Sequence, residues 1–391
     1  MRDMRPTPST VIFVAGFLIL FVGGGARFAI GLTLKPMVDE LGWMRGEVGL
    51  AVLAYLVVSA VATYLAGRLA DRASPSLLLN AGVVMSGLGI ALMCLVTQPW
   101  HAVLFYGVVF AVGNGMASLA PVGVMVTRAF PGRTGFANSA VISGMCLGQL
   151  VMIAALAAVL AEIGWRSVFA WLGIAHLVLI PFLLLALPRR TEGGGAVAAS
   201  GGLGVREAAR TGRFWLLLAV YAICGFDDFF VATHIVAFAQ DRGVDGLLAG
   251  NLLAFMGLTG LLGLLATGLI SDRAGPAWTS AFAFAARVAV FGLIAVDQST
   301  VSIAVFALVF GATFMVTAPM TVLFVRDHFG MKHLGALTGL ITMVHQIFGG
   351  IGAWGGALIF DATGTYDAAF VLALAVSALA LVLTLLLRER A

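Results

Sequence analysis

The sequence predicts an all-α membrane protein with twelve transmembrane helices, arranged as two six-helix bundles with pseudo-two-fold symmetry. Three observations lead to this prediction: the composition, the number of long apolar segments and an internal repeat. Hydrophobic residues make up 61% of the 391 residues and charged residues only 10%. Soluble domains carry about 45–50% apolar and about 25% charged residues. We therefore expect lipid to be the solvent for most of the surface.

Twelve segments have the roughly 20 mostly apolar residues that a transmembrane helix needs. They are 11–34, 46–67, 76–97, 101–127, 134–161, 166–187, 213–238, 246–270, 277–296, 300–325, 334–359 and 367–387. The longest polar stretch, 189–212, is rich in Gly, Ala and Arg, which predicts a flexible cytoplasmic linker. The expected domains are an N-terminal bundle over 1–188 and a C-terminal bundle over 213–391.

The distribution of Lys and Arg predicts the orientation, because cytoplasmic loops carry an excess of them. With the N-terminus inside, sixteen of the 22 basic residues fall in inner segments and four in outer loops. The other two, Arg27 and Arg287, lie within helices. We expect both termini in the cytoplasm and a bacterial inner membrane as the location.

A nine-residue segment occurs twice, about half a chain apart. Residues 67–75 (GRLADRASP) return as 268–276 (GLISDRAGP), an offset of 268 − 67 = 201. Each copy joins two apolar segments, which is typical of transporters built from repeated halves. We expect the shared residues of both copies to form inner-face latches that break as the halves move: Gly67, Asp71, Arg72, Gly268, Asp272 and Arg273.

These hairpins resemble the Gly-x-x-x-Asp-Arg signature of the major facilitator superfamily, and the repeat, the spans and the linker extend the resemblance over the whole chain. Residues 27–45, 130–137 and 225–243 and the pair His345-Gln346 also resemble bacterial monocarboxylate-porter-like members. The resemblance implies alternating-access transport of a monocarboxylate. Two features depart from the animal carriers: residues 23–26 read GGGA where those have an Asp-Gly-Gly-Trp type motif, and residues 260–265 lack their helix-eight Arg.

Four charged residues lie at membrane depth, where a charge costs about 2.5–3.5 kcal/mol or more. They are Arg27, Asp227, Asp228 and Arg287. A guanidinium suits a carboxylate because it offers two parallel donors, so both arginines are candidate substrate anchors. An internal ion pair between Arg287 and either aspartate is the alternative. The adjacent aspartates are about 100° apart on a helix, so we expect them to face different partners.

Uncharged polar groups complete the candidate site. Asn114, His345 and Gln346 are candidate substrate ligands, and His234 joins Asp227 and Asp228 as a candidate proton carrier. A packed, hydrogen-bonded role is the alternative for each histidine. The three cysteines show no metal-ligand spacing, and we expect no metal, no cofactor and no nucleic-acid partner.

We interpret the chain as a monomeric secondary transporter that moves a small organic anion, a monocarboxylate by resemblance, together with protons. The first alternative is proton-driven efflux of an amphipathic drug-like or metabolite compound. A non-transporting receptor on the same fold is the second. An embedded enzyme is the least favoured, because no nucleophile triad or phosphate loop occurs.

Overall fold

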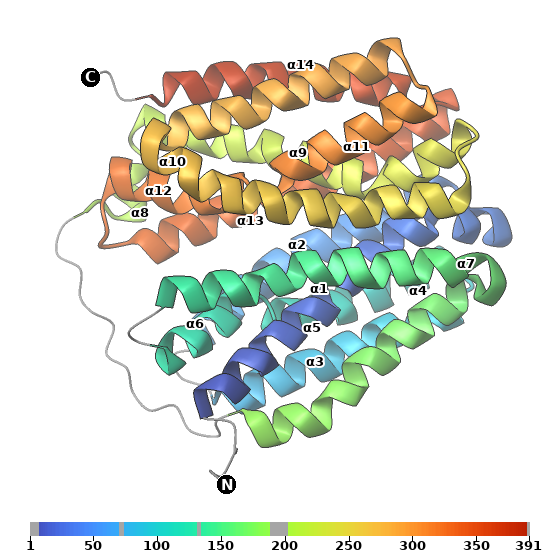
Figure 1. Ribbon diagram of the computed structural model, residues 1–391, viewed down its shortest axis with the longest axis horizontal. Coiled ribbons are helices and arrows are strands. Elements are labelled where there is room, and N and C mark those ends of the chain that lie inside the picture. Colours follow the sequence, from blue (N-terminus) through green and yellow to red (C-terminus); the bar gives the residue numbers. More distant parts are fainter. Residues whose placement is uncertain (1–7, 70–73, 131–133, 188–201, 389–391) are drawn as a thin grey trace, which may run out of the picture.

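The computed structural model describes residues 8–69, 74–130, 134–187 and 202–388. Its helices are α1 (Pro8–Leu41), α2 (Arg45–Leu69), α3 (Pro75–Leu92), η1 (Met93–Leu95), α4 (Pro99–Ala102), η2 (Val103–Phe110), α5 (Ala111–Met116), α6 (Leu119–Ala129), α7 (Thr134–Ala186), α8 (Val205–Ala208), α9 (Gly212–Asp241), α10 (Gly246–Val296), α11 (Thr300–Phe314), α12 (Thr317–Phe329), α13 (Leu334–Thr363) and α14 (Asp367–Leu386). In Figure 1, helices α1–α7 lie in one group and α9–α14 in a second group above it.

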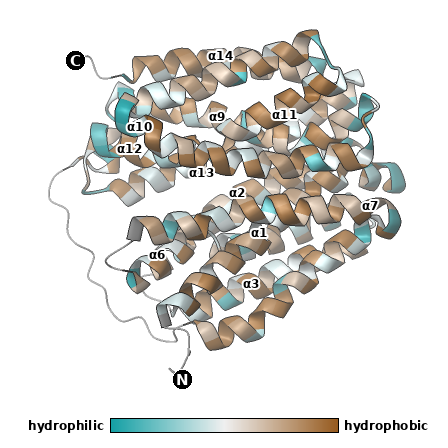
Figure 2. Cartoon of the chain, viewed as in Figure 1, coloured by the Kyte–Doolittle hydropathy of each residue, from teal (hydrophilic) through white to brown (hydrophobic). Residues whose placement is uncertain are grey.

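Ten apolar segments of the described chain are long enough to cross a membrane. Two of these, in α7 and α10, are 51 residues long and contain a residue with non-helical φ and ψ, Gly164 (φ 74°) and Gly275 (φ 77°). Only glycine adopts such a φ without strain. Each of the two segments is therefore a pair of membrane-crossing helices, and the described residues make the twelve crossings that the sequence predicted. Hydrophilic residues gather at the two ends of the helices (Figure 2).

Two predicted helices are interrupted because each contains a proline. The predicted helix 101–127 is divided into α4, η2, α5 and α6, with a break at Ala117 and Ser118. The predicted helix 300–325 is divided into α11 and α12, with a break at Met315. Each break lies four residues or fewer before a proline, Pro121 or Pro319. Proline has no N–H to donate to the carbonyl four residues earlier in a helix, and its ring clashes with that carbonyl. The first helix is also longer than predicted, since α1 continues to Leu41.

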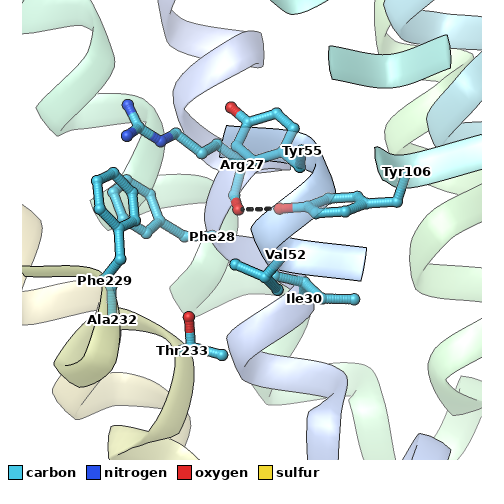
Figure 3. A pocket seen from close by; sticks show the side chains of 9 residues that line it. All are labelled: Arg27, Phe28, Ile30, Val52, Tyr55, Tyr106, Phe229, Ala232 and Thr233. Atoms are coloured by element: carbon cyan, nitrogen blue, oxygen red, sulfur yellow. Dashed lines mark hydrogen bonds between the residues drawn. The ribbon is translucent and has the colours of Figure 1, made fainter. Parts of the chain in front are cut away.

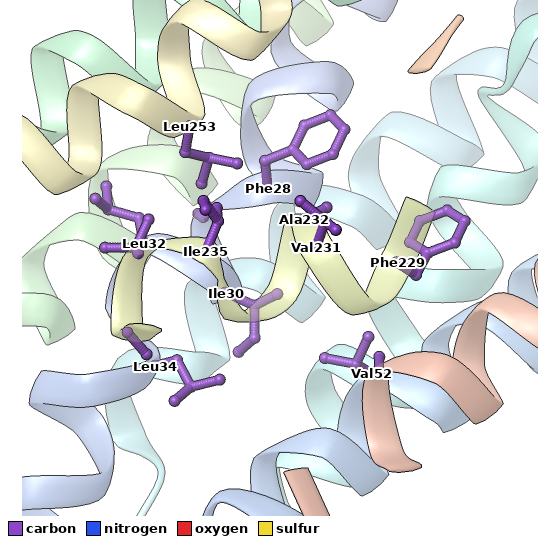
Figure 4. Packing of buried hydrophobic residues seen from close by; sticks show 14 of the residues in the cluster. Phe28, Ile30, Leu32, Leu34, Val52, Phe229, Val231, Ala232, Ile235 and Leu253 are labelled. Atoms are coloured by element: carbon purple, nitrogen blue, oxygen red, sulfur yellow. The ribbon is translucent and has the colours of Figure 1, made fainter. Parts of the chain in front are cut away.

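The two ends of the molecule differ in how the halves meet. We call the end with the turns at Gly275 and Gly330 the linker end, and the end with the turns at Gly42, Gly164, Gly243 and Gly364 the far end. Toward the far end, one continuous apolar cluster contains residues of both halves, among them residues of α1, α2 and α7 from one half and of α9, α10, α11, α13 and α14 from the other. Figure 4 shows part of it, with Ile30, Val52 and Val231 packed together.

At the linker end the apolar core is divided. One cluster belongs mainly to the N-terminal half, and from the other half Met315 is buried in it and Leu261, Leu264 and Phe314 pack against it. A second cluster lies entirely within residues 208–387. Apolar packing between the halves is therefore extensive toward the far end and limited to a few side chains toward the linker end.

Candidate functional site

A narrow pocket lies between the two halves and contains Arg27. Its lining comes from α1 (Arg27, Phe28, Ile30), α2 (Val52, Tyr55), η2 (Tyr106) and α9 (Phe229, Ala232, Thr233). In Figure 3 the Arg27 side chain extends toward the Phe28 and Phe229 rings. The guanidinium carbon is 4.7 Å from the centroid of the Phe229 ring, which belongs to the other half.

Arg27 has no charged partner among the residues that the structure describes. No acidic side chain lies within ion-pair distance of it, and its buried Nε has no hydrogen-bond acceptor. Aromatic rings are its close neighbours, and a cation over a ring face gains about 0.5–2 kcal/mol. The guanidinium N–H groups therefore remain open to an anion from outside the protein.

Two tyrosines build the wall beside Arg27. Tyr106 donates a hydrogen bond to the backbone oxygen of Arg27 at 3.0 Å (Figure 3). Tyr55 donates to the Asn114 Oδ1 at 2.9 Å, and the two tyrosine rings are 4.9 Å apart. Tyr106 lies in η2, a π-helical stretch, and such stretches often occur at functional sites. Asn114, a predicted ligand, thus supports the wall through Tyr55.

Toward the far end, Gly31 closes the pocket. A Cβ at Gly31 would overlap the backbone oxygen of Ala232, so α1 and α9 touch through their backbones there. A side chain at this position would separate the two halves. The contact brings Phe229 and Thr233 of α9 against the α1 face that carries Arg27.

Arg287 lies elsewhere, inside the C-terminal half. Its Nη2 is 2.7 Å from the Asp228 Oδ1, its Nε donates to the Thr313 hydroxyl at 3.0 Å, and it is fully buried. The substrate-anchor prediction for Arg287 does not fit this position, because Asp228, Thr313 and Cys224 already occupy its donors. The internal ion pair, left open by the sequence, is what the structure contains, and its partner is Asp228.

The two adjacent aspartates diverge, as expected from their spacing. Asp228 accepts from the His345 Nε2 at 3.1 Å with its second oxygen. Asp227 faces α14, where Ser377 donates to it at 2.6 Å. Asp227 is fully buried and lines no pocket that the structure describes. His345 is partly exposed, with 19% of its side chain accessible, whereas Asp228 is buried behind it.

A second close backbone contact positions His345. A Cβ at Gly225 in α9 would overlap the His345 backbone oxygen in α13. The ring of Phe229 is 6.0 Å from the His345 ring and 4.7 Å from the Arg27 guanidinium, measured from its centroid. Phe229 therefore separates the Arg27 pocket from the His345–Asp228 pair. Gln346, the neighbour of His345, is half-buried and does not line the pocket.

Cys224, Asp228 and His345 bring possible metal-ligand atoms within 4.8 Å of one another. Arg287 already contacts two of them, the Cys224 Sγ at 3.6 Å and the Asp228 carboxylate. A fixed cation beside two of three ligand atoms disfavours a metal ion there. The arrangement instead suits proton exchange between a histidine and a carboxylate.

A polar network, which we call the far-end gate, joins the halves at the far end. Arg45 at the start of α2 contacts Asp241 at 2.6 Å and donates to the Tyr366 hydroxyl at 2.8 Å. Lys35 contacts the same Asp241 at 3.0 Å. Asp361 of α13 accepts from the backbone N–H groups of Arg45 and Gly46 at 3.0 and 2.7 Å.

His234 belongs to this gate and lines no described pocket, which differs from its predicted role. Its Nε2 donates to the Ala353 backbone oxygen at 2.7 Å, so its Nδ1 accepts from the Tyr366 hydroxyl at 2.9 Å. Burial raises the pKa of the Tyr366 phenol, which keeps that proton in place. The gate's chain of donors and acceptors is complete without a titrating His234.

The predicted linker-end latches are not formed within the described chain. Asp71 and Arg72 lie outside the described residues. Gly268, Asp272 and Arg273 are exposed in α10, and Asp272 and Arg273 make no ion pair with a described residue. Gly67 lies near the end of α2.

The sequence did not identify the tyrosines or the far-end gate. The chain has only five tyrosines, and three of them, Tyr55, Tyr106 and Tyr366, form hydrogen bonds in the pocket wall or the gate. A phenol within an apolar segment needs a hydrogen-bond partner when it is buried. The small number of tyrosines in this apolar chain was the feature of the sequence that could have identified them as candidates.

Comparisons with known proteins agree on the fold. The family model described as Major Facilitator Superfamily matches residues 16–353 and 217–391. The uncharacterized MFS-type transporter YcxA of Bacillus subtilis is 22% identical over 93% of this chain and 91% of its own. Monocarboxylate transporter 13 of Rattus norvegicus is 25% identical over 93% of this chain and 83% of its own.

Among solved structures, the nucleoside transporter NupG superposes with a TM-score of 0.77 at 14% identity, covering 98% of this chain and all of the other. A bacterial homolog of the human lysosomal transporter Spinster, in an inward-facing and unoccupied conformation, gives 0.74 at 16% identity, covering 98% and 97%. At these identities the likeness concerns the fold.

The Arg287–Asp228 pair predicts a specific pattern of stability. Replacing Arg287 by Gln leaves a buried carboxylate unpaired, which should lower stability by about 3–5 kcal/mol. Adding Asp228→Asn should restore much of the loss, whereas adding the matched control Asp227→Asn should not. Thermal unfolding in detergent measures both. Rescue by Asp227→Asn instead would contradict the pairing.

The far-end gate predicts a local change in hydrogen exchange. Asp361→Ala removes the acceptor of two α2 backbone N–H groups, so exchange over residues 43–50 should accelerate about tenfold or more. The matched control is Asp367→Ala. This variant breaks the ion pair between Asp367 and Arg242, which is also at the far end but joins two residues of the same half. Equal acceleration of residues 43–50 in both variants would contradict a gate specific to the interface between halves.

Proposed function

The chain belongs to the major facilitator superfamily, and on that premise we propose that it carries a small monocarboxylate across the membrane together with a proton, by alternating access. The observation that carries this proposal is the state of Arg27. It is a guanidinium between the halves with no acidic partner among the described residues and with aromatic rings around it. A carboxylate is the ligand whose two oxygens match its parallel donors.

Location at the interface between halves favours Arg27 as the substrate anchor. Substrate sites of this class of transporter lie near the membrane midplane where the repeats meet. Arg27 is on α1 of one half, and Phe229 and Thr233 on α9 of the other complete the same pocket. A ligand there contacts both halves, so its binding can favour one arrangement of them over another.

The His345–Asp228 pair is the proposed proton site. Asp228 is held by Arg287, so that pair carries no net charge, and a proton on His345 adds one positive charge beside the pocket. An arriving anion and that proton attract each other across the Phe229 ring. Binding of either then strengthens binding of the other, which is the reciprocal coupling that cotransport requires.

The difference between the two ends supports a form open at the linker end. The far end is closed by the gate and the continuous core, while the linker end has a divided core. The basic residues predict a cytoplasmic linker end, which makes this the inward-facing form. Two relatives support the substrate class, through their names alone. They are monocarboxylate transporter 13 and, at 23% identity, monocarboxylate transporter 11 of Homo sapiens.

Arg27 variants test the substrate proposal. In proteoliposomes with an inward proton gradient, Arg27→Ala should abolish uptake of labelled monocarboxylates. Arg27→Lys should raise KM about tenfold or more, because it keeps the charge and loses the second donor. Arg388→Ala removes an exposed arginine at the linker end and serves as the control. Normal carboxylate uptake by a folded Arg27→Ala protein would refute the proposal and favour Arg-independent efflux of an amphipathic compound.

His345 tests the coupling. His345→Gln keeps a donor for Asp228 but does not titrate, so accumulation driven by a pH gradient should disappear while exchange of labelled for unlabelled substrate continues. His176→Gln is the matched control, since that buried histidine forms its hydrogen bond within its own helix, to the Leu172 oxygen. If His345→Gln still concentrates substrate, the proton site lies elsewhere and Asp227 is the next candidate.

A further inference from the structure

We propose that the carried monocarboxylate bears an aromatic ring close to its carboxylate. This proposal rests on the proposed function and narrows the substrate class of the same pocket. Its basis is the composition of the lining around Arg27, which combines one cation with four aromatic residues. The four are Phe28, Tyr55, Tyr106 and Phe229.

The two tyrosine hydroxyl groups of the lining are already engaged. Tyr106 donates to the Arg27 backbone oxygen, and Tyr55 donates to Asn114. Thr233 has the remaining side-chain hydroxyl among the lining residues. The pocket therefore offers a ligand one guanidinium, one threonine hydroxyl and otherwise apolar or aromatic surface.

The rings also determine how a ligand can meet the guanidinium. Phe229 and Phe28 lie 4.7 and 5.7 Å from the Arg27 guanidinium carbon, measured to their centroids. In Figure 3 both rings lie on the same side of Arg27, and the Tyr55 ring lies near it. Ring faces cover the guanidinium, so a carboxylate approaches its N–H edge. The rest of the ligand then contacts rings, which pack well against another aromatic ring.

This chemistry disfavours three other classes of ligand. A hydroxy acid would bury a hydroxyl group with few partners, which costs free energy. A dicarboxylate would bring a second charge to a pocket with a single cation. A nucleoside would bring several sugar hydroxyls and no anion for Arg27. An aryl monocarboxylate avoids each of these penalties.

Competition in proteoliposomes tests the ranking directly. Phenylacetate should inhibit Arg27-dependent uptake at a concentration at least about tenfold below that of lactate, which has the same charge. Phenylacetamide keeps the ring without the charge, and phenylmalonate adds a second carboxylate. Both should compete at least about tenfold more weakly than phenylacetate.

Two variants connect the ranking to the pocket. Phe229→Leu removes a ring and keeps an apolar side chain, so the ratio of phenylacetate to lactate inhibition should fall several-fold. Phe282→Leu replaces an exposed phenylalanine on the outer surface of α10 and should leave the ratio unchanged. The wild-type ranking tests the inference even where a variant fails to fold.

The outcomes separate this inference from the proposed function. Lactate competing as well as phenylacetate, in uptake that Arg27→Ala abolishes, overturns the aromatic preference and leaves monocarboxylate transport standing. Phenylacetamide competing as well as phenylacetate also overturns it, because the ring would then be recognised without the charge. Absence of any Arg27-dependent carboxylate uptake overturns the proposed function itself.

Discussion

One buried ion pair determines where the other polar groups of the C-terminal half can act. Arg287 joins three helices, because it sits on α10, binds Asp228 of α9 and donates to Thr313 of α11. Separating the two charges at membrane depth would cost several kcal/mol. With one oxygen of Asp228 held by Arg287, the other oxygen is directed toward His345. The position of the proposed proton site thus follows from the buried ion pair between Arg287 and Asp228, which lies outside the Arg27 pocket.

The two membrane-depth arginines illustrate how surroundings separate two identical side chains. Arg287 is neutralised within a single half, whereas Arg27 faces rings from both halves and no described carboxylate. The region between the halves is therefore left with a positive charge that no acidic side chain of the described residues balances. An anion that enters the pocket supplies that balance, and low-dielectric surroundings strengthen the attraction.

The fold was predictable from the sequence because apolar length, basic-residue bias and the repeat are properties of the chain alone. The charged candidates were also identifiable, since each stands out in an apolar segment. Their partners were not. Asp227 and Asp228 have the same neighbours in sequence, and only the rotation of α9 determines which one meets Arg287. His234 looked titratable in sequence, but its neighbours Ala353 and Tyr366 are more than a hundred residues away and come from two further helices.

The repeat that organises the fold has diverged at the far end, and the gate shows how. With the offset of 201, Asp241 corresponds to Glu40 (241 − 40). Glu40 still binds Trp165, within the N-terminal half. Asp241 instead binds Arg45 and Lys35 from the opposite half. The corresponding position therefore has two roles. In the N-terminal half it stabilises that half internally, and in the C-terminal half it connects the two halves.

The start of α2 has diverged in the same way. Asp245 caps α10 with its own carboxylate, but the equivalent position before α2 is Met44, which has no acceptor. Asp361 of the other half supplies the missing cap. If the far end opens, α2 loses its cap and α10 keeps its own. The two corresponding helices therefore differ in whether their first turn stays capped during the transport cycle. Loss of a single capping residue after duplication is enough to turn an ordinary helix start into a contact that reports whether the halves are together.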